Sequence, residues 1–196
     1  MRTRDADKEL LVKQTAIQML VADGFEGFSM NKLAKACNVS VATLYIYYKD
    51  KDDLIIKIAI EEGKEMNDAT LRNFNADMPF AEGLRRQWEN RYKYMTEHAD
   101  SLQFFDQLRS STYQEKVFDN ITHNFKEVLG QFVLNAEKRG EINKMAIETY
   151  WSVAFAPLYA LIRFHNQGKS MGGKPFTISN KILWETFDLV LKAFKK

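Results

Sequence analysis

Cysteine, histidine and long apolar runs are scarce in this sequence, and each shortage excludes a class of protein. The only cysteine among 196 residues, Cys37, excludes an internal disulfide and a multi-cysteine zinc site. The three histidines lie far apart and outside any HExxH-like pattern, which leaves metal catalysis without support. The longest nearly apolar run, Tyr150 to Ile162, has 13 residues, well short of the roughly 20 that cross a bilayer. The N-terminus lacks the apolar stretch of a secretory signal, so we expect a cytoplasmic protein with no membrane partner.

Neither sign of charge is in large excess. Lysine and arginine number 28 and aspartate and glutamate 26, a net charge of +2. Only the segment from Phe28 to Lys51 is clearly basic, with four lysines against Asp50. A local charge of +3 there suits a phosphate backbone, although the net charge alone would not indicate one.

The dominant hydrophobic period is that of an α-helix, and no segment alternates with the period of a strand. The sequence therefore predicts an all-α fold of about nine helices. The expected helices span residues 5–22, 29–37, 41–48, 50–67, 79–98, 102–108, 117–138, 145–166 and 178–194. Pro157 lies inside the eighth of these and is expected to kink it.

Two of the short helices form a candidate helix-turn-helix motif at about residues 28–47. Ser29 and Ser40 are suited to cap the two helices, and Asn38 can take the positive φ of a tight turn. A longer helix precedes the pair, so the N-terminus is expected to form a three-helix head.

The second helix of the motif has one inward and one outward face. At 100° per residue, Val41, Leu44 and Tyr48 share the inward side, which with Leu33, Ala34 and Val39 would form a small core. The outward side contains Ala42, Thr43 and Ile46, flanked by Tyr45 and Tyr47. An outward isoleucine is unusual in water and suits contact with a thymine methyl group in the major groove.

At these residues the sequence resembles the TetR/AcrR family of bacterial transcriptional regulators. The resemblance covers residues 8–60 and rests on Ser29, Leu33-Ala34, the turn ending in Val39-Ser40, Leu44-Tyr-Ile-Tyr-Tyr48 and Lys51-Asp-Asp-Leu54. It implies DNA binding by residues 1–56, and effector binding and dimerisation by residues 57–196.

Carried over position by position, the resemblance implies contacts to DNA phosphates from Ser29, Thr43, Tyr45, Tyr47 and Lys51. It implies contacts to base edges from Asn31, Val41, Ala42 and Ile46. Two departures from the family pattern lie in the motif. Cys37-Asn38 replaces the common Ala-Gly, and Val41-Ala42 stands where polar residues or glycine are common, which leaves the operator sequence open.

The two C-terminal helices are the expected dimer interface. Both carry apolar residues on more than one face, and with their symmetry mates they would form a four-helix bundle. The alternative is that both are internal core helices. Specific affinity from so small a DNA-reading head favours two copies on a palindromic operator, hence a homodimer.

The middle of the chain is rich in aromatic residues that could line a pocket for an apolar or aromatic effector. The expected pocket residues are Trp88, Tyr92, Phe104, Phe105, Gln107, Phe125, Trp151, Phe155 and Tyr159. Further polar candidates are Arg91, Gln103, Asp106, His123 and Asn124. Most aromatic residues of this kind form ordinary core.

The sequence thus predicts a ligand-responsive transcriptional regulator, a repressor by the family's habit, with no enzymatic activity, cofactor or metal. Gly168-Lys169-Ser170 lacks the first glycine of a phosphate loop and follows a helix, not a strand. One alternative is a helical ligand-binding or scaffold protein whose helix-turn-helix does not bind DNA. A weaker alternative is an all-α enzyme.

Overall fold

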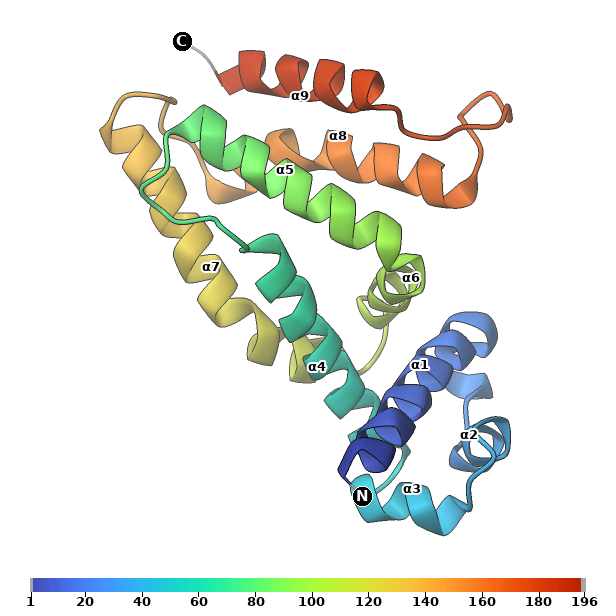
Figure 1. The fold of residues 1–196 in the computed structure, drawn as a ribbon. Helices are drawn as coiled ribbons and strands as arrows, with labels where there is room; N and C mark the ends of the chain where they lie inside the picture. The colour runs from blue at the N-terminus through green and yellow to red at the C-terminus, as the bar shows by residue number, and fades with distance from the viewer. Residues whose placement is uncertain (1, 195–196) are drawn as a thin grey trace. The chain divides into compact units, whose positions relative to one another are not determined.

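The computed structural model describes residues 2–194, except for the side chains of residues 2–6 and 124. Asn124, one of the expected pocket residues, therefore lies outside the described side chains. Within this range the fold is all-α, as predicted, and its helices are drawn in Figure 1. They are α1 (Arg2–Gly27), α2 (Met30–Ala36), α3 (Val41–Tyr47), α4 (Lys51–Thr70), α5 (Phe80–Glu97), α6 (Ala99–Leu108), α7 (Gln114–Lys138), α8 (Ile147–Gln167) and α9 (Asn180–Phe194).

Most helix boundaries fall within a few residues of those expected, because residues at the boundaries specify them. Gly24 takes φ 70° and ψ 173° and breaks the helical path of α1, so the regular helix ends where the glycine predicted. Gly168 takes φ 67° at the C-terminus of α8. The helix α8 runs through Pro157 as a single element. No helix of the described residues is long and apolar enough to span a membrane.

The chain divides into two compact units that interleave along the sequence. The first unit contains residues 1–65 and 98–121, and the second contains residues 66–97 and 122–196. The expected boundary between residues 56 and 57 falls inside α4, and α6 groups with the N-terminal helices. Sequence spacing did not indicate that residues 98–121 group with the N-terminal helices, because this grouping depends on contacts between segments far apart in the chain.

The first unit is built around the apolar faces of α1 to α4, and α6 packs on α1. Leu20, Leu33, Leu44 and Leu54 come from four successive helices, and each is at most 1% exposed. The amide of Gln107 on α6 donates to the carbonyl of Val21 on α1 at 3.0 Å. The helix-turn-helix therefore rests on a core that includes a segment about 50 residues further along the chain.

A charged cluster lies inside the first unit. The Lys13 ammonium is 2.9 Å from Oε1 of Glu62 and 2.7 Å from Oε1 of Glu65. The Ser101 hydroxyl donates to Oε2 of Glu62 at 2.5 Å. Burial opposes the charged form of Lys13, but hydrogen bonds to Glu65 and Glu62 outweigh it and raise the pKa of the lysine. This cluster joins α1, α4 and α6.

The second unit has an aromatic core, in which α8 packs against both α5 and α9 (Figure 1). Trp88 on α5 is fully buried, and its indole N–H donates to the carbonyl of Ala154 on α8 at 2.8 Å. The ring of Phe187 on α9 meets the Trp88 ring edge to face at 5.4 Å. Gly83 leaves room for the Phe132 ring, which a Cβ atom at this position would overlap.

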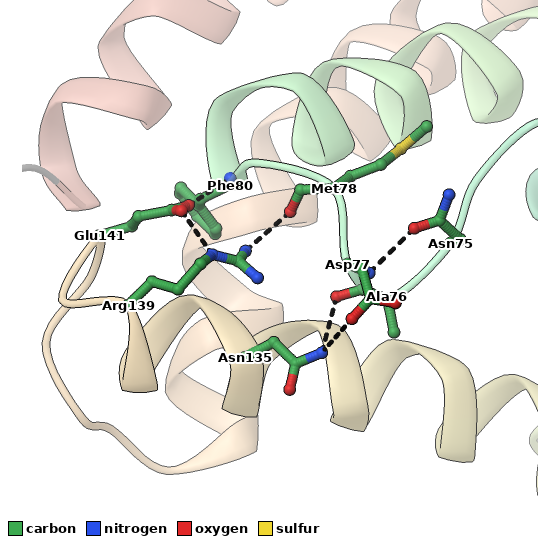
Figure 2. A network of polar contacts seen from close by, with 8 residues as sticks. All are labelled: Asn75, Ala76, Asp77, Met78, Phe80, Asn135, Arg139 and Glu141. Carbon is green, nitrogen blue, oxygen red and sulfur yellow. Dashed lines mark hydrogen bonds and ion pairs between the residues drawn. The ribbon is translucent and has the colours of Figure 1, made fainter.

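Polar side chains from the end of α7 fix the turn that leads into α5 (Figure 2). Asn135 donates to the carbonyl of Ala76 at 3.1 Å, and Arg139 donates to that of Met78 at 2.8 Å. Glu141 accepts from the backbone N–H of Phe80, the first residue of α5, and from Arg139 at 2.6 Å. The bond from Arg139 is the main cause that lowers the pKa of Glu141, so a carboxylate caps α5.

Candidate nucleic-acid interface

The helix-turn-helix is held in shape by side-chain caps at both helices. Ser29 Oγ accepts from the backbone N–H of Lys32 at 3.3 Å, and Ser40 Oγ accepts from that of Thr43 at 3.1 Å. Asn38 takes φ 53° in the turn between them, as its residue type predicted. The motif is therefore specified locally, by the residues that begin each helix and reverse the chain.

The two faces of α3 point as the sequence predicted. Leu44 is 1% exposed and joins the core, whereas Ile46 is 76% exposed on the opposite side. Tyr45 and Tyr47 flank it and are 52% and 37% exposed. An apolar side chain this exposed costs free energy in water, which is offset where a partner covers it.

The other expected contact residues lie around this face with different degrees of exposure. Asn31 and Ala42 are exposed, whereas Ser29, Val41, Thr43 and Lys51 are half-buried. The Thr43 hydroxyl shares a 2.8 Å hydrogen bond with the Ser40 hydroxyl. Val41 was expected both in the core and against a base edge, and its half-buried side chain lies between these extremes.

Lys51 is more constrained than the sequence indicated. Its ammonium donates to the carbonyl of Phe25, near the end of α1, at 2.7 Å. A lysine bound in this way stabilises the junction of α1 and α4, and its charge still contributes to the local potential. No local pattern indicated this contact, because the two residues are 26 positions apart.

The N-terminus of α4 is capped by its own acidic residues. The backbone N–H of Asp53 donates to Oδ1 of Asp50 at 2.8 Å, as a capping box requires. The second bond of a capping box would join Asp53 to the N–H of Asp50, but Oδ2 of Asp53 accepts from the N–H of Lys49 instead. That bond, with the nearby Lys57, lowers the pKa of Asp53. These carboxylates reduce the attraction of this helix end for phosphate.

Lys57 is a residue that sequence reasoning missed. Its ammonium lies 2.9 Å from the Asp53 carboxylate and donates to the carbonyl of Tyr47 at 3.2 Å. It thereby caps the C-terminal end of α3. The i, i+4 spacing from Asp53 was the available signal.

The expected effector residues belong to both units and are described within each. Phe104 and Phe105 are buried in the first unit with the Phe25 ring, and Gln107 donates to α1. Four residues of the second unit surround Arg91, namely Phe125, Trp151, Phe155 and Tyr159. Trp88 packs against Phe187, and Tyr92 is half-buried. Gln103, Asp106 and His123 are exposed.

Comparison with known proteins agrees with the geometry of the N-terminal helices. Residues 14–58 match the family described as "Bacterial regulatory proteins, tetR family". These residues include α2, α3, the part of α1 from Gln14 onward and the first two turns of α4. The N-terminal motif of this chain is that of the TetR family.

Solved structures of TetR-family proteins have a similar fold. A TetR family transcription regulator from Marinobacter aquaeolei VT8 is 25% identical, with a TM-score of 0.80 and complete coverage of both chains. A TetR-family regulator from Haemophilus influenzae Rd is 22% identical, with a TM-score of 0.77 over 98% of this chain and 99% of that one. The second likeness concerns the fold alone.

A curated relative extends the likeness beyond the motif. An HTH-type transcriptional regulator of Haemophilus influenzae is 30% identical over 122 residues, 62% of this chain. The match spans 65% of that relative's length. The likeness to TetR-family proteins therefore comes from the N-terminal motif and the fold, and the match to the curated relative covers under two thirds of either chain.

Proposed function

We propose that this TetR-family chain is a transcriptional regulator of the cytoplasm that binds double-stranded DNA through the outward face of α3. The observation that supports this most strongly is Ile46, 76% exposed between two exposed tyrosines on a capped helix. In a major groove the isoleucine would contact thymine methyl groups. The tyrosine hydroxyls would donate to phosphate oxygens and set the orientation of the helix.

The outward face carries few groups that can recognise bases by hydrogen bonding. Val41, Ala42 and Ile46 would contribute apolar contacts, and Asn31 is the expected base-contact residue that carries an exposed amide. Sequence preference would therefore depend on thymine methyl groups and on DNA shape. The exposed lysines Lys35 and Lys49 would add attraction without sequence preference.

A variant of Ile46 tests this assignment. Ile46→Glu places a carboxylate on the face proposed to meet DNA, and we expect at least about tenfold weaker binding to the region upstream of the chain's own gene. Met171→Glu is the matched control, because Met171 is 89% exposed on the loop after α8 and gives the same change in charge. A mobility-shift titration measures both.

The result also separates the two candidate functions. Equal affinity of wild type and Ile46→Glu would contradict the role of α3. Absence of DNA binding by the wild type, both to this region and to a random-sequence duplex pool, would favour a helical ligand-binding or scaffold protein. The apolar pair Val41-Ala42, which offers few hydrogen bonds to bases, is the feature that supports this second candidate function.

The same proposal includes a homodimer formed by α8 and α9. Leu189 on α9 is 66% exposed and Ile147 on α8 is 46% exposed, so both helices present apolar side chains that the chain itself does not cover. A two-fold pair of such helices would bury them in a four-helix bundle. Two α3 helices would then bind the half-sites of a palindromic operator.

Regulation would follow from an apolar or aromatic effector bound among the aromatic residues of the second unit. Repression released by the effector is the form we propose. A coupling of about 1–3 kcal/mol between the two sites would weaken operator binding roughly 5- to 150-fold. Operator affinity measured with and without saturating effector tests this coupling.

A further inference from the structure

Arg91 is a buried cation in the second unit. It lies on α5 and is 3% exposed. Its guanidinium carbon lies 4.2 Å from the centre of the Phe155 ring and 5.2 Å from that of Trp151. Rings at these distances stabilise a cation through their π faces but supply no negative charge.

The hydrogen bonds of Arg91 leave its charge uncompensated. One Nη donates to the Tyr159 hydroxyl at 2.9 Å, and the other donates to Oε1 of Gln87 at 3.0 Å. Its Nε–H, also buried, has no acceptor among the described residues. No carboxylate of the described residues forms an ion pair with it, although buried charges in proteins are normally paired.

The Tyr150 hydroxyl is a second buried donor without a partner, and the charge of Arg91 acts on it. Tyr150 on α8 is fully buried, and its hydroxyl has no hydrogen-bond partner among the described residues. The centres of the Tyr150 and Phe155 rings are 6.0 Å apart, and the guanidinium carbon of Arg91 lies over the same Phe155 ring. Burial raises the pKa of Tyr150, and the charge of Arg91 lowers it only in part. The hydroxyl therefore keeps its proton at neutral pH.

We propose that Arg91 and Tyr150 bind the anionic group of the effector, a carboxylate or comparable organic oxyanion whose apolar body packs against Trp151 and Phe155. This inference rests on the proposed effector site and names the chemical class of its ligand. The guanidinium suits a planar anion, because Nε–H and a neighbouring Nη–H can donate in parallel to two oxygens. The ligand would supply the missing negative charge.

The proposal requires the aromatic side chains around Arg91 to move and admit the ligand. Phe125, Trp151 and Tyr159 are half-buried, so these three rings are partly exposed to solvent. Rotation of these side chains would admit a ligand, and the aromatic faces that now stabilise the cation would then contact the ligand's apolar body. The binding conformation is thus a minor state that the anion selects.

Matched probes and variants test the anion. The probes are decanoate and decan-1-ol, which share a chain of ten carbons, and benzoate with benzamide. The variants are Arg91→Met, Arg91→Lys and the control Arg85→Met, which removes an exposed arginine from the same helix. Affinity is measured on the full chain from the change in tryptophan fluorescence, and thermal melting is recorded for each variant without ligand.

We expect the wild type to bind at least one anion about tenfold or more tightly than its neutral partner. Arg91→Met should weaken binding of that anion about 10- to 100-fold, because a hydrogen-bonded charge pair is lost. The affinity for the neutral probe should not change. Arg85→Met should behave as the wild type. Arg91→Met should also melt no lower than the wild type, because an uncompensated buried charge has been removed.

Other results would overturn the proposal. These are equal binding of the anions and their neutral partners, unchanged anion affinity in Arg91→Met, or no binding of either anion to the wild type. If Arg91→Met does not fold, Arg91→Lys decides, because it keeps the charge but loses the parallel donors. Unchanged anion affinity in that variant would also overturn it. DNA binding is measured separately, so a chain that binds the anion but no DNA refutes the proposed regulator and leaves this inference standing.

Discussion

Lys13 and Glu62 show how far one buried residue depends on another. Lys13 is 8% exposed and Glu62 is 5% exposed, so neither charge is well solvated. Each is stabilised by the other and by polar neighbours on different helices. Removing one partner leaves a buried charge, which costs more than losing the contact itself.

Lys13→Met should lower the free energy of unfolding by about 3 kcal/mol at pH 7, because Glu62 is left without its cation. Urea denaturation measures the change. Lys64→Met, an exposed lysine on the same helix as Glu62, should change stability by less than about 0.5 kcal/mol. The double variant Lys13→Met/Glu62→Leu should recover most of the loss. A double variant no more stable than Lys13→Met would contradict the pairing.

The lowered pKa of Asp53 predicts that the free energy of unfolding depends on pH in the acid range. Its pKa is lowered by the N–H of Lys49 and the ammonium of Lys57, so its contribution to stability is complete above the ordinary value of 3.8. The contribution is lost as the pH falls through the lower pKa of the folded state. Asp53→Asn should therefore cost about 0.5–1 kcal/mol at pH 7 and progressively less below pH 3.8.

Chemical denaturation of both proteins at several pH values between 2 and 7 would measure this difference. Asp68→Asn provides the matched loss of one negative charge in the last turn of the same helix. A cost for Asp53→Asn that stays constant from pH 7 to pH 2 would show that the carboxylate is not responsible.

At the scale of helices, two glycines of the second unit should respond to alanine in opposite directions. A Cβ at Gly83 on α5 would overlap the Phe132 ring, so Gly83→Ala should destabilise by about 1–3 kcal/mol. A Cβ at Gly130 on α7 would meet nothing within 4 Å, so Gly130→Ala should stabilise by about 0.5–1 kcal/mol. Thermal melting measures both. Equal effects would contradict the close approach of α5 and α7 at Gly83.

The elements that the sequence predicted are those set by neighbouring residues. Ser29, Asn38 and Ser40 act within four positions of their partners, so the motif and the outward side of α3 followed from spacing alone. Contacts across long separations gave no such signal. The bond from Lys13 to Glu65 spans 52 positions, and the bond from Arg91 to Tyr159 spans 68.

The candidate sites show the same division. The DNA contacts remain predictions: Tyr45, Ile46 and Tyr47 are exposed on α3 as expected, whereas four of the other expected residues are half-buried. Arg91 was one of several polar candidates, and nothing in the sequence distinguished it from the exposed Gln103 or Asp106. Only the packing of α5 against α8 shows that it alone of these is buried among aromatic rings.

For the whole molecule, the proposed dimer predicts how the molecular mass in solution responds to a substitution on α9. Leu189→Glu should convert the protein to a single chain at micromolar concentration, because a charge would be buried at the apolar face of α9. Light scattering measures the mass, and binding to a two-site operator should weaken in parallel. Met171→Glu should leave both unchanged. A wild type that is already a monomer, or a Leu189→Glu variant that remains dimeric, would contradict the interface.

The interleaving of the two units has a consequence for synthesis and for chimaeras. During translation, residues 66–97 leave the ribosome before α6, so the first unit cannot be completed until part of the second has been made. A graft that transfers only residues 1–56 would leave behind the donor's Gln107 and the Phe104 ring that contact α1. A hybrid regulator would keep the recipient's α6, and its stability would depend on how well that helix packs against the grafted α1.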